Sequence, residues 1–142
     1  MTFPSDPKDL VLSVIMPAYN EEDTVEMAVR ILHQVPLRLE IVAVNDGSRD
    51  RTPEILDRLA ASGLVHRVVH QPGNRGKGAA VRAGIEAASG HVIVVQDADL
   101  EYDPQQLPAL LEPIRQNKAD AVYGSRFQGG PRRVLYFWHS IG

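Results

Sequence analysis

Short apolar runs alternate with amphipathic segments along the first 125 residues of the chain. The runs are rich in β-branched residues and occupy residues 10–18, 39–45, 64–70, 91–96 and 119–125. The segments between them carry apolar residues at helical spacing and cover residues 21–35, 52–62, 79–88 and 107–117. This alternation predicts an α/β fold, a three-layer α/β/α sandwich with a mostly parallel sheet that is buried on both faces.

Capping residues set the expected ends of the helices. Asn20 is a good N-cap for the first helix, whose acidic residues would then fall in the first turn, where the helix dipole favours them. Pro53 suits the first position of the second helix, and Gly63 is expected to end that helix. Asp103 is expected to cap the fourth helix.

The last sixteen residues hold half of the eight aromatic side chains, and Arg132 and Arg133 stand among them. Within this part, the stretch RRVLYFWHSIG (132–142) predicts a helix that either lies on lipid headgroups or packs into the core with a solvated basic edge. The chain then stops without a cap or a polar tail. We therefore expect an N-terminal extension over 1–9 and one domain over 10–142 that is the first part of a longer protein.

Composition narrows the possible classes of function. A net charge of −3 over 142 residues gives no basic field that would favour nucleic acid. The absence of cysteine excludes disulfides, zinc–thiolate sites and thiol nucleophiles, and it fits a reducing compartment. The first residues lack the pattern of a signal peptide, and no apolar run approaches the roughly 20 residues of a membrane span.

Four unusual stretches follow the predicted strands. They are PAYNE after the first, NDGSRD after the second, GNRGKG after the third and DADLEYD after the fourth. In open parallel sheets, ligands bind outside the carboxyl ends of the strands. The four stretches therefore predict one composite site at that edge.

Several well-known sites are excluded at these positions. An EF-hand loop counted from Asp97 needs Gly and Glu where Tyr102 and Pro108 stand. The turn PAYNEE has no glycine, unlike a dinucleotide-binding turn, and GNRGKGAA lacks the spacing and the hydroxyl of a P-loop. His66 and His70 would lie roughly 13 Å apart on a strand, so we expect structural or solvated roles for them rather than one shared metal.

The fourth strand ends in an Asp-x-Asp pair. Mg²⁺ and Mn²⁺ prefer oxygen ligands, and Mg²⁺ often takes one or two carboxylates together with substrate phosphates. Asp97 and Asp99 are therefore either part of such a shell or solvated turn residues. Glu101 is a third candidate ligand, whereas Asp103 is expected to turn away and cap a helix.

Three more side chains at the predicted edge suit a nucleotide. Tyr19 places a ring where it can stack on a flat ligand. Asp46 follows the second strand, where nucleotide-binding folds place a hydrogen-bond acceptor, or else it only caps a turn. Lys77 stands between glycines that let the backbone approach a phosphate closely, unless it is simply a surface lysine.

From residue 11 to residue 142 the chain resembles the family 2 inverting glycosyltransferases, nucleotide-sugar enzymes with the Rossmann-like GT-A fold. The stretches that carry the resemblance are, in order, SVIMPAYNEEDTV, VAVNDGSRDRTPEIL, NRGKGAAVRAGIEAASG, VVQDADLEYDP and ADAVYGSRF. Within the family, DADLEYDP followed by YGSRFQGG and YFWHSIG is most similar to the dolichyl- and polyprenyl-phosphate hexose transferases, the group of dolichol-phosphate mannose synthase.

The resemblance implies a set of residues that bind the nucleoside. Pro17, Tyr19 and Glu21 would line its pocket. Val44 and Asp46 would contact the base, with Asp46 accepting a hydrogen bond from a ring N–H.

A second implied set surrounds the diphosphate and the sugar. Asp97 and Ala98 would contact the ribose and the sugar, and Asp99 would bind the metal with help from Asp97. Glu101, the third implied ligand, stands where related sequences often carry Gln. Arg126 would face a phosphate.

The implied reaction is the transfer, with inversion, of glucose or mannose from UDP-glucose or GDP-mannose. Mg²⁺ or Mn²⁺ would offset the negative charge on the leaving diphosphate, and Lys77 would contribute further positive charge. A polyprenyl or dolichyl phosphate acceptor is already anionic and demands little of a general base, which this sequence does not supply. The alternatives are transfer to a saccharide hydroxyl in polysaccharide synthesis and a non-catalytic nucleotide-sugar-binding fragment. The implied location is the cytoplasmic face of a membrane, and the domain would be cut before its acceptor-side segment.

Overall fold

The computed structural model describes residues 4–101, 103–116, 121–125 and 132–137. The strands in these ranges are β1 (Val11–Ala18), β2 (Arg38–Asn45), β3 (Arg67–His70), β4 (Val92–Val95), β5 (Ala121–Ser125) and β6 (Arg132–Phe137). The helices are α1 (Val25–Leu32), α2 (Thr52–Ala61), α3 (Lys77–Ala87) and α4 (Leu107–Arg115), with short 3-10 helices η1 (Pro7–Asp9) and η2 (Pro104–Gln106).

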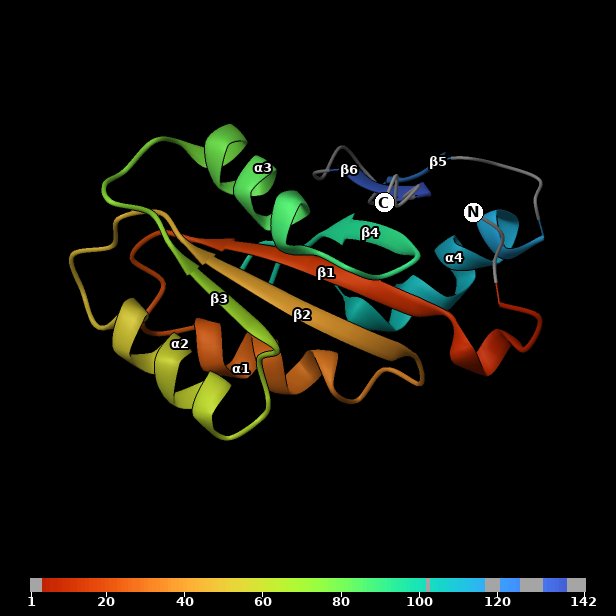
Figure 1. Ribbon diagram of the computed structural model, residues 1–142, viewed down its shortest axis with the longest axis horizontal. Coiled ribbons are helices and arrows are strands. Elements are labelled where there is room, and N and C mark those ends of the chain that lie inside the picture. The colour runs from red at the N-terminus through yellow and green to blue at the C-terminus, as the bar shows by residue number, and fades with distance from the viewer. Residues whose placement is uncertain (1–3, 102, 117–120, 126–131, 138–142) are drawn as a thin grey trace.

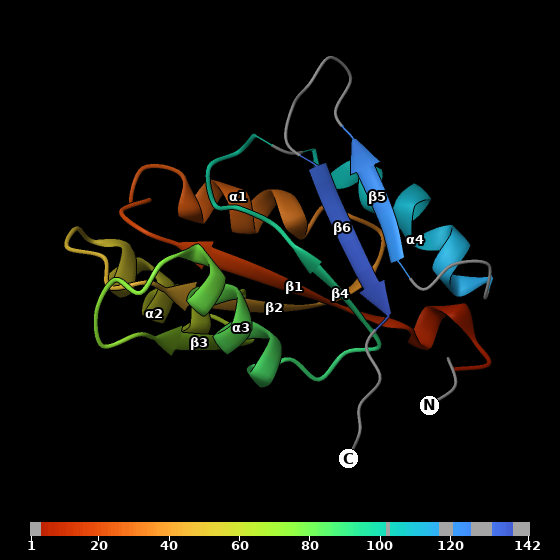
Figure 2. The ribbon, with the colours of Figure 1, turned by 90° about the horizontal axis from the view of Figure 1, so that it is seen from above.

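The strands form one sheet in the order β3-β2-β1-β4-β6-β5 (Figures 1 and 2). The pairs β1–β2, β1–β4 and β2–β3 are parallel, and β6 runs antiparallel to both β4 and β5. The expected mostly parallel sheet is therefore confirmed, and β6 is the strand that departs from it.

Helices cover both faces of the sheet, which confirms the expected three layers. Figure 1 shows α1 and α2 on one side of the sheet and α3 on the other. Buried residues of α1, α2 and α4 share one apolar cluster with β1, β2 and β4, whereas Ile85 of α3 packs on Ile15, Val42 and Ile93 on the opposite face. The strands β1 and β2 are therefore buried on both faces, as their continuous apolar sequences predict.

The prediction of a helix over the chain's last residues is wrong where the structure describes them. Residues 132–137 form β6, which pairs with β4 and β5. The sequence RRVLYF is rich in β-branched and aromatic residues, which suit a strand. The far edge of β4 would otherwise leave a row of backbone N–H and C=O groups without partners. Residues 138–142 lie outside the described part.

The prediction of Asn20 as an N-cap is also wrong. Helix α1 begins at Val25 with Thr24 at the N-cap position, so the acidic residues 21–23 precede the helix. Asn20 has a left-handed backbone (φ 53°), and its side-chain Oδ1 accepts a hydrogen bond from Arg49 N at 2.9 Å. Asparagine suits both a helix N-cap and a left-handed turn, and the hydrogen bond to the next loop favours the turn.

Most of the other expected boundaries are confirmed. Pro53 lies in the first turn of α2, and Gly63 follows α2 with φ 82°. Asp103 caps η2, the short 3-10 helix directly before α4, rather than α4 itself, because its carboxylate accepts a hydrogen bond from Gln105 N at 3.0 Å. Helix α3 starts two residues before the predicted 79–88, and β3 is shorter than the predicted 64–70.

A polar network at the amino ends of the strands anchors the turn that joins α3 to β4. The Glu40 carboxylate accepts hydrogen bonds from Ser13 Oγ at 2.8 Å and from Ser89 N at 2.7 Å, and Arg67 lies 3.6 Å away. Burial alone would raise the pKa of Glu40, but hydrogen bonds from Ser89 and Ser13 and the charge of Arg67 outweigh it and lower that pKa.

Candidate active site

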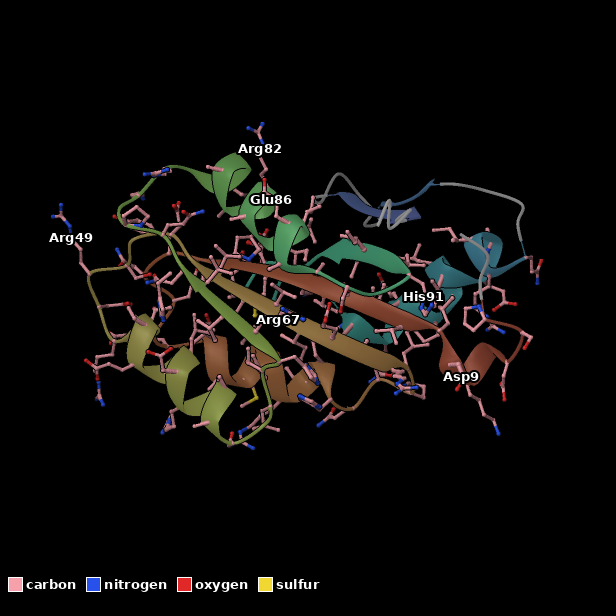
Figure 3. All side chains as sticks on the ribbon, in the orientation of Figure 1. Asp9, Arg49, Arg67, Arg82, Glu86 and His91 are labelled. Carbon is pink, nitrogen blue, oxygen red and sulfur yellow. The ribbon has the colours of Figure 1, made fainter. Side chains whose placement is uncertain are left out.

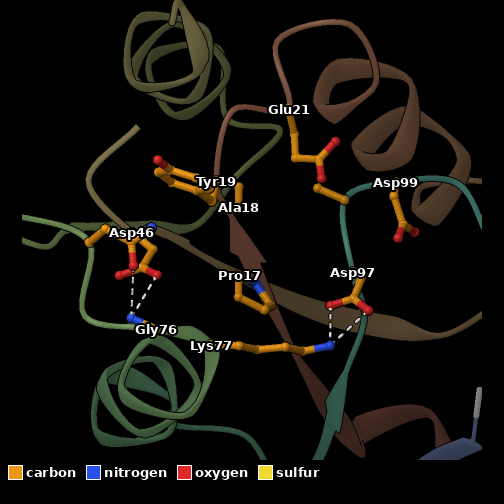
Figure 4. Close-up of a pocket in the computed structure, with 11 residues that line it drawn as sticks. Pro17, Ala18, Tyr19, Glu21, Asp46, Gly76, Lys77, Asp97 and Asp99 are labelled. Carbon is orange, nitrogen blue, oxygen red and sulfur yellow. Dashed lines mark hydrogen bonds and ion pairs between the residues drawn. The ribbon is translucent and has the colours of Figure 1, made fainter. Parts of the chain in front are cut away.

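A cavity of about 350 Å³ opens at the carboxyl ends of β1, β2 and β4, beside the start of α3 (Figure 4). Its lining residues are Pro17, Ala18, Tyr19, Glu21, Asp46, Asn74, Gly76, Lys77, Asp97, Ala98 and Asp99. Each of the four unusual stretches of the sequence contributes to this lining. The structure thus brings them together at one edge of the sheet.

Asp46 is a fixed carboxylate at one side of the cavity. It is only 4% exposed. Its two oxygens accept hydrogen bonds from Arg75 N at 2.9 Å and from Gly76 N at 3.1 Å, and its own N–H donates to Ala18 O at 2.9 Å. A carboxylate has about four acceptor positions, so Asp46 retains capacity for an N–H group of a ligand.

The turn after Asp46 lies directly against the loop that leads to α3. Gly47 has φ 72°, a left-handed conformation that favours glycine. A Cβ atom at this position would lie 2.4 Å from Asn74 N. The absence of a side chain therefore lets the two loops meet and brings the 75–76 amides within reach of Asp46.

The β1–α1 loop is tied to the β2–α2 loop. Asn20 N donates to Ser48 Oγ at 3.0 Å, and Glu21 N donates to Thr52 Oγ1 at 2.9 Å. These bonds fix the backbone on either side of the cavity mouth. Tyr19, which is 43% exposed, lines the cavity beside them (Figure 4).

Asp50 adds a charged contact between the same two loops. Its carboxylate accepts hydrogen bonds from Thr52 N at 2.9 Å and from Glu22 N at 3.1 Å. Slight burial would raise the pKa of Asp50, but the hydrogen bonds from Thr52 and Glu22 outweigh it and lower that pKa.

The Asp-x-Asp turn after β4 is attached to the start of α1. Thr24 Oγ1 lies 2.6 Å from Ala98 O and 3.1 Å from Glu21 Oε2. Asp99 lines the cavity, and its Oδ1 accepts a hydrogen bond from Glu101 N at 3.1 Å. The turn therefore presents Asp97 and Asp99 to the cavity while Thr24 holds the residue between them.

Lys77, the first residue of α3, reaches across the cavity to Asp97 (Figure 4). Its Nζ lies 2.8 Å from both carboxylate oxygens of Asp97. The lysine side chain is 61% exposed and that of Asp97 is 24% exposed. This ion pair joins α3 to the end of β4 within the cavity.

The cavity lining is acidic, since it carries the carboxylates of Glu21, Asp46, Asp97 and Asp99 against Lys77. No group of three or more His, Asp or Glu side chains in the described residues is arranged to hold a metal. Asp97 and Asp99 supply two oxygen ligands on one turn. Two carboxylates with open positions fit Mg²⁺ or Mn²⁺ when a substrate phosphate completes the shell.

Two of the predicted site residues lie outside the cavity lining, and a third is not described by the structure. Val44 is fully buried and faces Gly84 of α3, and Glu101 is exposed. Arg126 is not among the described residues. The roles given to these three side chains stay predictions.

The structure also adds residues that the sequence analysis did not select. Asn74 and Gly76 line the cavity, and Thr24 supports the Asp-x-Asp turn. Asn74 and Gly76 belong to the glycine-rich stretch GNRGKG, which the sequence already marks as unusual. Nothing in the local sequence marks Thr24, whose partner lies 74 residues away.

His66 and His70 have structural partners, as expected. His66 Nδ1 accepts a hydrogen bond from Ile41 N at 2.9 Å. His70 bridges Asn45, at 3.1 Å, and Asp57, at 2.9 Å. Neither ring lines the cavity.

Comparison with solved structures confirms the expected GT-A fold. A mannosyltransferase from Pyrobaculum calidifontis, solved with GDP-Man and Mn²⁺, superposes with a TM-score of 0.77 at 20% identity over 94% of this chain and 48% of that one. Glucosyl-3-phosphoglycerate synthase from Mycobacterium tuberculosis, solved with Mn²⁺, UDP and phosphoglyceric acid, gives a TM-score of 0.68 at 31% identity over 85% and 45% of the two chains.

Comparison with curated proteins gives the family. The glycosyltransferase AglD of Haloferax volcanii is 40% identical over 129 residues, which are 87% of this chain and 20% of that protein. The dolichol-phosphate mannosyltransferase of Pyrococcus furiosus is 40% identical over 121 residues, 84% of this chain and 34% of that protein. The chain thus spans about a fifth to a third of the length of these two relatives. The sequence model of the family described as glycosyl transferase family 2 matches residues 13–142, and the chain belongs to this family.

Proposed function

We propose that the cavity binds the nucleotide-sugar donor of a hexosyltransferase whose acceptor is a polyprenyl phosphate. The observation that carries the proposal is the arrangement of Asp46, Asp97 and Asp99, which line one cavity at the carboxyl edge of the sheet. A nucleoside diphosphate requires a fixed hydrogen-bond acceptor for its base. It also requires a pair of carboxylates that hold a metal ion against its phosphates.

Asp46 and Tyr19 are suited to the nucleoside. The Asp46 carboxylate is oriented by two backbone amides, and its remaining lone pairs accept the ring N–H of a base. The exposed ring of Tyr19 offers a surface for stacking, with Pro17 and Glu21 completing the lining. Val44, which is buried and stands two residues before Asp46 in the sequence, keeps its predicted contact with the base as part of this proposal.

Asp97 and Asp99 are the proposed metal ligands. The related synthase from M. tuberculosis was solved with Mn²⁺ and UDP, which supports a divalent ion, Mg²⁺ or Mn²⁺, in this site. Such an ion supplies a Lewis acid that offsets the charge on the leaving diphosphate. Asp97 and Ala98 hold the sugar end of the donor, Lys77 contributes positive charge, and Arg126 is assigned to a phosphate.

The acceptor proposal depends on the relatives. The curated relatives include a dolichol-phosphate mannosyltransferase and a dodecaprenyl-phosphate galacturonate synthase, the latter 34% identical. Attack by an anionic lipid phosphate on the face opposite the diphosphate inverts the anomeric carbon and demands little of a general base. None of the described helices is long and apolar enough to cross a membrane. We assign the enzyme to the cytoplasmic face of a membrane, where such an acceptor is held.

Calorimetry tests the donor site. UDP-glucose or GDP-mannose should bind with Mn²⁺ present and bind at least about tenfold more weakly in EDTA or in Asp99→Asn, because the diphosphate then loses a charge-assisted contact. Glu86→Gln is the matched control, since Glu86 is on α3 and lies outside the cavity lining. Equal donor affinity with and without the metal would remove the metal role. Product analysis on the longer protein, with lipid phosphate and oligosaccharide acceptors, separates the proposed transfer from transfer to a saccharide hydroxyl.

A further inference from the structure

The ion pair between Lys77 and Asp97 places a cation of the protein on a carboxylate that the proposed function gives to a metal. The Nζ atom of Lys77 lies 2.8 Å from each carboxylate oxygen of Asp97. The lysine therefore contacts both oxygens that would bind the metal. Lys77 and a divalent ion therefore cannot both hold this carboxylate in the same way.

The pair is held weakly enough to open. The lysine side chain is 61% exposed, and ion pairs of this exposure contribute little to stability. Lysine carries a compact charge on a flexible four-carbon stem, so its ammonium group can swing while α3 stays in place. The stem starts at the first residue of α3, and the glycines on either side of it, Gly76 and Gly78, have open space where a Cβ atom would stand.

The surrounding charge favours a cation at this place. Glu21, Asp46 and Asp99 line the same cavity as Asp97, and Asp46 already accepts hydrogen bonds from two backbone amides. Without Lys77 or a metal, Asp97 and Asp99 would stand two residues apart with no opposing charge among the lining residues that the structure describes.

We propose that Lys77 is an exchangeable cation: it occupies Asp97 in the empty site, yields Asp97 to the divalent metal, and turns to the diphosphate of the incoming donor. This proposal rests on the proposed donor site. Its consequence is that metal and nucleotide-sugar bind cooperatively. The metal alone must displace Lys77 without compensation, whereas the diphosphate gives the displaced ammonium group a new partner. By linkage, the metal strengthens donor binding by the same factor as the donor strengthens metal binding.

The exchange predicts effects of opposite sign for Lys77→Met. The affinity for Mn²⁺ alone, measured from the free-ion signal in electron paramagnetic resonance, should rise about two- to fivefold, the factor that corresponds to an exposed ion pair. The affinity for UDP-glucose or GDP-mannose at saturating Mn²⁺, measured by calorimetry, should fall at least about tenfold, because a charged contact to the diphosphate is lost. A lysine with a merely structural role would lower both affinities or neither.

Two further variants control for charge and folding. Arg82→Met removes one positive charge from the same helix, and Figure 3 shows Arg82 pointing away from the sheet. It should leave both affinities unchanged. Lys77→Arg retains the charge and should restore most of the donor affinity.

The outcomes separate this proposal from the donor function. If the wild type binds donor but Lys77→Met changes neither affinity, or lowers that for Mn²⁺, the exchange is wrong and the donor site stands. If the substitution raises the Mn²⁺ affinity but the wild type binds no nucleotide-sugar, the donor function is wrong, and only the exchange between lysine and metal at Asp97 is supported.

Discussion

The contact between the two loops beside Asp46 predicts an unusually costly glycine substitution. Gly47 and Gly63 both have left-handed backbones, with φ of 72° and 82°. A Cβ atom at Gly47 would lie 2.4 Å from both Asn74 N and Gly73 C, which are backbone atoms that cannot rotate away, whereas no atom lies within 4 Å of that position at Gly63. Alanine at either site has the same conformational strain, but only alanine at position 47 adds a clash.

The magnitude follows from these two terms. An alanine in the left-handed region costs about 1–2 kcal/mol, partly offset by the lower entropy of the unfolded chain, so Gly63→Ala should lower the free energy of unfolding by about 1 kcal/mol. Overpacking against fixed atoms adds about 1–3 kcal/mol, so Gly47→Ala should lower it by about 2–4 kcal/mol. Urea denaturation, with slopes compared to confirm two-state behaviour, measures both values. Equal losses in the two variants would refute the loop contact that positions Asp46.

Three other variants test separate parts of the structure. Glu40→Gln should lower the free energy of unfolding by about 1–3 kcal/mol at pH 7, because donors such as Ser89 N lose a charged acceptor. The pKa of Glu40 is lowered in the folded state, so its contribution is present above about pH 4.3 and is lost as the pH falls below that value; denaturation curves of both proteins should therefore converge in acid. Asp46→Asn should weaken donor binding at least about tenfold in calorimetry, since the base loses a charged acceptor. Thr24→Val should cost about 1–3 kcal/mol of stability and weaken Mn²⁺ binding, because Ala98 O loses its partner, whereas Thr24→Ser retains the hydroxyl and should behave as wild type.

Most of the fold could be predicted because its signals are local. Several parallel strands are continuous apolar runs, and the helical segments between them carry apolar residues at helical spacing, so the order of the elements is visible in the sequence. The edge of the sheet that carries the site follows from that order, since parallel strands all end on the same side. The cavity accordingly collects residues from all four stretches that were selected.

The errors concern choices that distant residues decide. Asn20 is equally suited to a cap and to a left-handed turn, and Ser48 and Arg49 of the next loop decide for the turn. The strand β6 forms because it pairs with β4, about 40 residues earlier in the chain, which a window along the sequence does not reveal. The same limit applies to the ion pair of Lys77 with Asp97, whose partners are 20 residues apart.

The most direct test of the donor site is paramagnetic broadening of backbone amide signals in the NMR spectrum by Mn²⁺ with UDP-glucose or GDP-mannose. Mn²⁺ broadens the signals of nearby nuclei, so the residues that lose signal locate the ion. We predict that the amides of Ala98, Asp99 and Gly76 broaden first, and that EDTA restores them. The acidic residues Asp23 and Glu54 line a separate surface hollow between the β1–α1 loop and α2, which offers a different place for the ion. Broadening centred on that surface, with the Asp-x-Asp turn unaffected, would contradict the assignment of the cavity as the metal and donor site.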